Sequence, residues 1–69
     1  MKFYEVEFED GFSIAIKGTR MPTVEEAEHF CQYKYAKAVN VLEITEEEAR
    51  NFFDCSKIDD WPVFNGEGD

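Results

Sequence analysis

The chain has 69 residues, enough for one small domain, and its 16 acidic residues against 7 Lys and Arg give a net charge of −9. A chain this short buries only about 60% of the surface that its unfolded form exposes, so its core depends on large side chains. Seven Phe, three Tyr and one Trp supply them. The acidity argues against direct binding to nucleic acid or to anionic membranes, because both are negatively charged.

The sequence shows neither a membrane span nor a secretion signal. No stretch approaches the ~20 apolar residues that a membrane-spanning helix needs. Residues 1–5 alternate between polar and apolar types and lack the continuous apolar run of a signal peptide. We therefore expect a cytoplasmic protein, in which Cys31 and Cys55 are free thiols.

Residues 2–8 and 12–17 alternate apolar and polar side chains, which predicts two half-buried strands joined as a hairpin. A two-residue loop at Asp10 and Gly11 would set core residues opposite polar ones. A three-residue loop at 9–11, with Gly11 in the left-handed conformation, makes every facing pair apolar. We therefore predict the pairs Phe8 with Phe12, Val6 with Ile14, and Tyr4 with Ile16.

Two capping boxes predict two helices, the first beginning after Thr23 and the second after Thr45. Apolar residues spaced three and four apart from Val24 to Ala38 predict a first helix of about four turns. The second helix is short, and its apolar side is formed by Ala49, Phe52 and Phe53.

Residues 39–44 are rich in β-branched side chains and predict a third strand, with Leu42 and Ile44 on one face and Val41 and Glu43 on the other. The resulting fold class is α+β, with the order β-β-α-β-α and a right-handed connection through the first helix. We expect one domain over residues 1–69, frayed at about 65–69. Its three-stranded antiparallel sheet has the order 2-1-3 and both helices on one face, which comprises Tyr4, Val6, Phe8, Ile14, Ile16, Leu42 and Ile44.

No pattern in the sequence points to catalysis, so we do not expect an enzyme or a bound cofactor. The only histidine, His29, is two positions from Cys31, and on a helix such residues point about 200° apart. They cannot chelate one metal ion together, and no catalytic nucleophile can be paired with this histidine. We expect an exposed His29 and a buried Cys31.

Two features are candidates for contact with a partner. The strand order 2-1-3 brings Glu5, Glu7 and Glu43 together on the sheet face away from the helices; the alternative is an ordinary solvated face. The segment at residues 58–64, which contains Asp59, Asp60 and Trp61, mixes acid with apolar anchors. The alternative there is that Trp61 and Phe64 fold back to close the core. The acidity itself either attracts a basic protein surface or only confers solubility.

These acids and the segment ITEEEARNFFD at residues 44–54 are the residues that carry a resemblance to a known class of proteins. In size, charge and build the chain resembles the small acidic inhibitor proteins of phages and mobile elements, anti-CRISPR proteins among them. The resemblance implies a protein that blocks the basic nucleic-acid-binding surface of an effector, with carboxylates in place of phosphates. The alternative function is a small regulatory or assembly module. The oligomeric state stays open.

Overall fold

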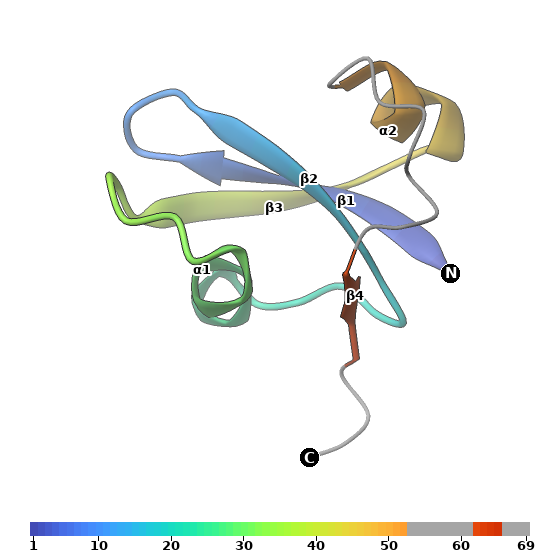
Figure 1. Ribbon diagram of the computed structural model, residues 1–69, viewed down its shortest axis with the longest axis horizontal. Coiled ribbons are helices and arrows are strands. Elements are labelled where there is room, and N and C mark those ends of the chain that lie inside the picture. Colours follow the sequence, from blue (N-terminus) through green and yellow to red (C-terminus); the bar gives the residue numbers. More distant parts are fainter. Residues whose placement is uncertain (53–61, 66–69) are drawn as a thin grey trace.

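The computed structural model describes residues 1–52 and 62–65. Its elements are β1 (Lys2–Phe8), β2 (Ser13–Gly18), α1 (Val24–Cys31), β3 (Ala38–Ile44), α2 (Glu46–Phe52) and β4 (Val63–Phe64), as Figure 1 shows. The predicted α+β class is confirmed. Among the described residues, no helix is long and apolar enough to cross a membrane.

The hairpin of β1 and β2 has the predicted register. The strands pair antiparallel with Val6 opposite Ile14. At the closed end, the Phe8 amide donates to the Phe12 carbonyl at 2.9 Å, and the Gly11 amide donates to the Phe8 carbonyl at 3.0 Å. The loop therefore has three residues, and Gly11 has a φ of +88°. Glycine suits this position because it adopts positive φ without steric cost.

The sheet has four strands in the order β3-β1-β2-β4, so the prediction of three antiparallel strands is incomplete. β4 pairs in parallel with the end of β2, where Gly18 lies opposite Phe64. The Thr19 amide donates to the Phe64 carbonyl at 3.0 Å, and the Phe64 ring meets the Phe30 ring edge-on at 5.7 Å. A strand of two residues is too short to show a period of two, which is why the sequence pattern does not predict it.

Helix α1 covers one face of the sheet and closes the main core. Its capping box is formed as predicted, since the Glu26 amide donates to the Thr23 hydroxyl and the Thr23 amide donates to the Glu26 carboxylate. Beneath the helix lies a cluster of buried side chains: Tyr4, Val6, Phe8, Ile16, Ala27 and Ala38.

Helix α1 ends at Cys31, so the predicted four-turn helix reaching Ala38 is wrong. Gln32 adopts the left-handed conformation with a φ of 55°, and its amide donates to the Glu28 carbonyl at 3.2 Å. The left-handed backbone of Gln32 terminates the helix, because it turns the chain away from the helical path. Ala38 instead begins β3, where it lies opposite Phe8.

Strand β3 faces the opposite way from the prediction. Val41 and Glu43 lie opposite Val6 and Tyr4 of β1, so these two residues face α1, and Leu42 and Ile44 face the other side. The sequence has apolar residues at both parities, so alternation cannot choose the buried face. A bulge early in β3 further breaks the count.

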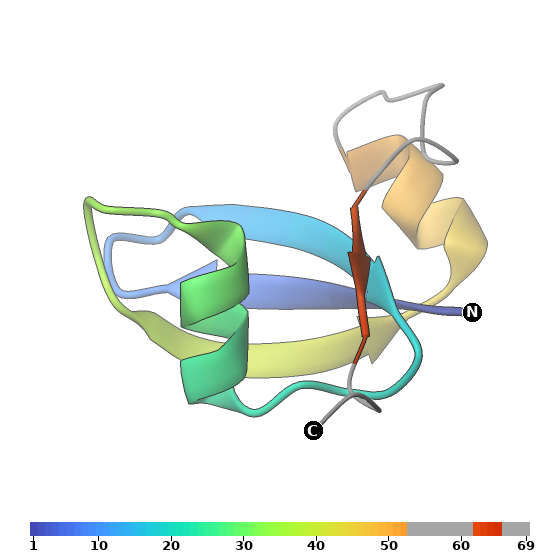
Figure 2. The same ribbon diagram turned by 60° about the horizontal axis from the view of Figure 1, so that its bottom comes forward.

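Helix α2 lies on the sheet face away from α1, so the prediction of both helices on one face is wrong (Figures 1 and 2). Its buried residue, Ala49, is not part of the core under α1. Ala15 and Lys17, which alternate to this second face, are also buried. Only Thr45 separates β3 from α2, so no connection is long enough to carry the helix round to the first face.

Candidate functional site

The structure brings together only part of the predicted partner-binding set. Glu5 and Glu7 share the sheet face opposite α1. The prediction placed them away from both helices, but α2 lies on this same face. Glu43 lies on the other face. Asp59, Asp60 and Trp61 lie outside the described residues, so their part in binding stays a prediction.

Glu5 and Glu7 form an acidic row along β1, which is an interior strand of the sheet. Glu7 lies opposite Ser13 on β2 and Asn40 on β3. The Asn40 side-chain amide donates to the Glu7 carboxylate at 3.4 Å. Alternate residues of a strand recur about every 6.6 Å, which sets the spacing of the row. Within the described residues neither carboxylate has a cation as partner.

Glu43 is removed from this row by the register of β3. It lies opposite Tyr4, and its carboxylate is 3.6 Å from the Lys2 ammonium group. Both side chains are more than half exposed, so this ion pair contributes little to stability. The predicted cluster of Glu5, Glu7 and Glu43 is therefore wrong.

Both arginines of the chain form ion pairs with helix carboxylates: Arg20 with Glu26 of α1, and Arg50 with Glu46 of α2. Arg20 binds Glu26 through two hydrogen bonds, of 2.9 and 3.0 Å, and these bonds lower the pKa of Glu26 to about 2. Arg50 binds Glu46 at 2.7 Å, one helical turn away on α2. Neither arginine therefore neutralises the carboxylates of the acidic row or of the hairpin turn within the described part of the chain.

An aromatic surface at the closed end of the hairpin was missed by the sequence reasoning. We call Phe12, Tyr33 and Tyr35 the aromatic end. The Phe12 and Tyr33 rings stack at 5.0 Å, and the Tyr33 and Tyr35 rings meet edge-on at 5.4 Å. Tyr35 is 85% exposed and Phe12 45% exposed. A signal was present, because residues 33 and 35 of a helix point about 200° apart and cannot both reach a core.

Asp10 joins this surface to the hairpin turn. Its carboxylate accepts a hydrogen bond from the Tyr33 hydroxyl and another from the Phe12 amide, the latter at 3.0 Å. The hydrogen bond from Tyr33 holds the pKa of Asp10 below its ordinary value. The same bond raises the pKa of the Tyr33 hydroxyl to about 12. Asp10 is therefore a carboxylate anion fixed by Tyr33 and by the backbone of Phe12.

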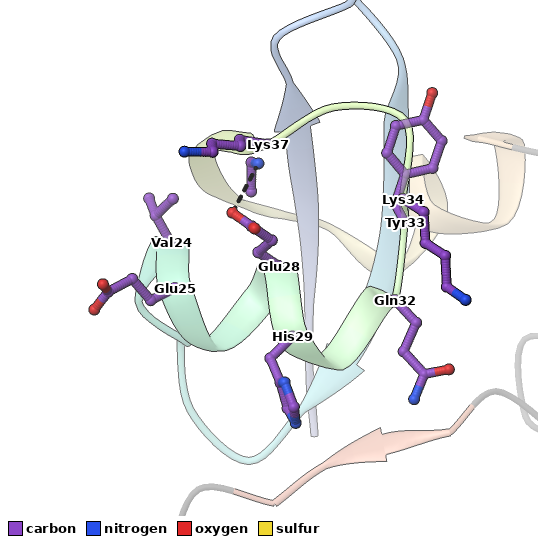
Figure 3. A pocket seen from close by; sticks show the side chains of 9 residues that line it. Val24, Glu25, Glu28, His29, Gln32, Tyr33, Lys34 and Lys37 are labelled. Carbon is purple, nitrogen blue, oxygen red and sulfur yellow. Dashed lines mark hydrogen bonds between the residues drawn. The ribbon is translucent and has the colours of Figure 1, made fainter.

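A hollow of about 870 Å³ runs along α1 and the loop that follows it. It combines carboxylates of Glu25 and Glu28 with Lys34 and Lys37. Glu28 is engaged in structure, since it accepts a hydrogen bond from the Ala38 amide at 3.3 Å. Figure 3 shows the titratable side chains pointing in different directions rather than toward a common point. The hollow therefore offers no converging acid and base.

His29 and Cys31 lie in the last turn of α1 and differ in exposure. His29 is exposed, and Cys31 is half-buried. Burial raises the pKa of the Cys31 thiol to about 11, so the thiol is neutral near pH 7. Residues 1–52 and 62–65 contain no group of three His, Cys, Asp or Glu side chains placed to hold a metal ion. Cys55 lies outside the described residues.

The candidate site is therefore a surface, with the acidic row on one sheet face and the aromatic end beside the hairpin turn. Neither feature depends on a cofactor or on a reactive side chain. Comparison of the chain with models of known protein families, with curated proteins and with solved structures found no match. Its function must therefore be argued from this surface alone.

Proposed function

We propose that this protein is a non-catalytic binding protein that docks its acidic sheet face on a basic surface of a protein partner. The observation that carries the proposal is the acidic row of Glu5 and Glu7, which continues into Glu9 and Asp10 at the turn. No ion pair neutralises these four carboxylates within the described residues. A one-sided anionic strand is suited to a cationic partner.

The net charge of −9 supports the same conclusion. The field of the whole domain repels nucleic acid and attracts basic proteins, and it would speed their encounter. Carboxylates along a strand recur at about 6.6 Å, a regular spacing that suits a row standing in for successive phosphates. We therefore favour a partner that normally binds nucleic acid, and an inhibitor that occupies its groove.

The runner-up is a regulatory or assembly module whose partner binds no nucleic acid. The exposed aromatic end favours a protein interface in either case, because aromatic residues are enriched in such interfaces. The identity of the captured partner separates the two. An inhibitor's partner binds DNA or RNA, and added nucleic acid displaces the protein from it.

The test is capture of partners from the source cell on the immobilised protein, followed by association kinetics with the purified partner. We expect the association rate to fall steeply between low and physiological salt, since exposed charges beyond about 8–10 Å are screened. The double variant Glu5→Gln/Glu7→Gln should associate more slowly. It should keep its fold, because both changes preserve side-chain size on a partly open face.

The matched control is Glu25→Gln/Glu47→Gln, which removes the same charge from the two helices. Similar slowing by both double variants would mean that only the overall charge matters, and the sheet face would lose its role. A partner whose binding ignores salt and the row would refute the proposal. A partner that binds no nucleic acid would leave the regulatory module in place of the inhibitor.

A further inference from the structure

The aromatic end exposes two aromatic rings to solvent, those of Tyr35 and Phe12. Tyr35 has the largest exposed fraction among the large apolar and aromatic side chains of the described residues, at 85%. Scattered exposed apolar residues are ordinary, whereas contiguous ones mark interaction sites. Here the three rings are contiguous, since Tyr33 contacts both Phe12 and Tyr35.

Two of these rings, Tyr33 and Phe12, are packed in the folded protein before a partner binds. Tyr33 packs against the buried Phe8 ring at 4.5 Å and stacks on Phe12 with an interplanar angle of 16°. Its hydroxyl is fixed by Asp10. An interface whose side chains are already ordered loses less conformational entropy on binding.

The charge beside the rings is negative. Asp10 contacts Tyr33 directly, and exposed Glu9 precedes it in the turn. Two lysines, Lys34 and Lys37, lie in the same loop as the tyrosines, and they line the hollow along α1 together with Tyr33. In Figure 3 the Tyr33 and Lys34 side chains point in opposite directions. The charge in direct contact with the aromatic end is therefore the carboxylate of Asp10.

We propose that the aromatic end binds an arginine-bearing segment of the partner. Guanidinium groups are planar and weakly hydrated, they stack on aromatic rings, and they pair with carboxylates. Asp10 and the exposed ring of Tyr35, joined through Tyr33, offer both interactions within one patch. This inference rests on the proposed function, because it names where the basic partner makes its apolar contacts.

The experiment titrates the amide-labelled protein with a blocked Gly-Arg-Gly-Arg-Gly peptide and follows backbone NMR shifts. Two matched peptides replace both arginines by citrulline, which is neutral, or by lysine, which is not planar. We expect shifts at Asp10, Phe12, Tyr33 and Tyr35 with the arginine peptide, none with citrulline and smaller ones with lysine. Equal binding of the lysine peptide, or shifts centred on the acidic row, would overturn the arginine site.

Protein variants complete the test. Tyr35→Leu keeps an apolar side chain but removes the ring, and it should weaken the peptide about two- to fivefold, the size of an exposed cation–π contact. Asp10→Asn should weaken it too, while its side chain still accepts from the Phe12 amide. Met21→Ala, a simple truncation at a residue 44% exposed in the loop before α1, is the control and should bind normally. Unchanged binding by Tyr35→Leu refutes the inference.

The purified partner separates this inference from the proposed function. Slower association of Glu5→Gln/Glu7→Gln with unchanged dissociation of Tyr35→Leu would sustain the acidic row and reject the aromatic end. Faster dissociation of Tyr35→Leu, with no effect of the double variant, would sustain the aromatic end and reject docking through the sheet face.

Discussion

The Tyr33 hydroxyl donates a hydrogen bond to Asp10, a residue 23 positions earlier in the chain. The contact ties the loop after α1 to the turn between β1 and β2. The other oxygen of Asp10 accepts from the Phe12 amide at 3.0 Å, which closes the turn itself. One carboxylate therefore orders two segments that come together only in the folded state.

Tyr33→Phe should lower stability in a manner that depends on pH. The pKa of Asp10 is below its ordinary 3.8 in the folded state, so the contribution of the bond is present above 3.8 and lost as the pH falls through the lowered value. The pKa of Tyr33 rises from 10.0 to about 12, so the contribution is also lost as the pH rises through that range. Urea midpoints of the two proteins should thus differ most between pH 3.8 and 10.0 and converge outside that window.

Tyr35→Phe serves as the control for this pH series, because it removes a hydroxyl from the neighbouring ring and leaves the bond between Tyr33 and Asp10 in place. It should follow the parent protein at every pH. A gap for Tyr33→Phe that does not change with pH would mean that the ring, and not the hydroxyl, accounts for its effect.

Gly11→Val should destabilise the protein by more than ~1 kcal/mol, because a β-branched residue is strained at positive φ. An added Cβ would meet nothing within 4 Å, so strain rather than a clash would account for the loss. Gly11→Asn should cost less, since asparagine tolerates the left-handed conformation. Thermal or urea unfolding of the three proteins checks the order, and equal stability of all three would contradict it.

Gly18→Ala should loosen β4 from β2. An added Cβ at this position would lie 2.9 Å from the Phe64 carbonyl oxygen and 3.1 Å from its Cβ. Neither atom belongs to a flexible side-chain end, so the strands must separate, at a cost of about 1–3 kcal/mol that is typical of overpacking. Urea unfolding measures the loss.

A double-mutant cycle tests whether that loss comes from β4. The Phe64 ring contacts Phe30 and lies under the Arg20 guanidinium, 5.2 Å from it. Phe64→Ala should therefore destabilise the parent protein but have a smaller effect in the Gly18→Ala background. Additive effects would show that β4 stays docked despite the added methyl group.

Thr23→Ala and Thr45→Ala should each lower stability by ~0.5–2 kcal/mol, as loss of a helix cap does. Both hydroxyls accept from a backbone amide three residues on, at 3.1 Å. Thr→Ser at the same positions keeps the hydroxyl and should be nearly neutral. If the serine and alanine variants unfold at the same denaturant concentration, the caps make no contribution.

The features that the sequence predicted correctly are those fixed by neighbours in the chain. The three-residue loop follows from Gly11 and from the need to pair apolar residues across the hairpin. The caps at Thr23 and Thr45 follow from a hydroxyl and a glutamate three residues apart. Each of these is decided within about ten residues, so tertiary contacts confirm it and do not override it.

The features that failed depend on contacts between distant segments. The predicted helix continued past Cys31 because Tyr35 and Ala38 have helical spacing. In the structure the chain leaves the helix at Gln32, and Tyr33 stacks on Phe12. Strand β3 has apolar residues on both faces, so the alternation alone could not choose the face that α1 covers. With Leu42 turned outward, Glu43 moves to the α1 side, and the predicted acidic cluster loses its third member.

The hydrogen bond between Asn40 and Val41 affects how this sheet can grow. The backbone amide and carbonyl of Phe8 both bond on the side of β2. Because these groups alternate along a strand, the backbone groups of Glu5 and Glu7 point toward β3. The Val41 amide, which lies opposite Val6, then points away from the sheet. That amide donates to the Asn40 side-chain oxygen at 3.0 Å. A strand added from another copy must first displace this oxygen. Asn40 therefore makes an edge with exposed Val39 and Leu42 a poor template for fibril growth.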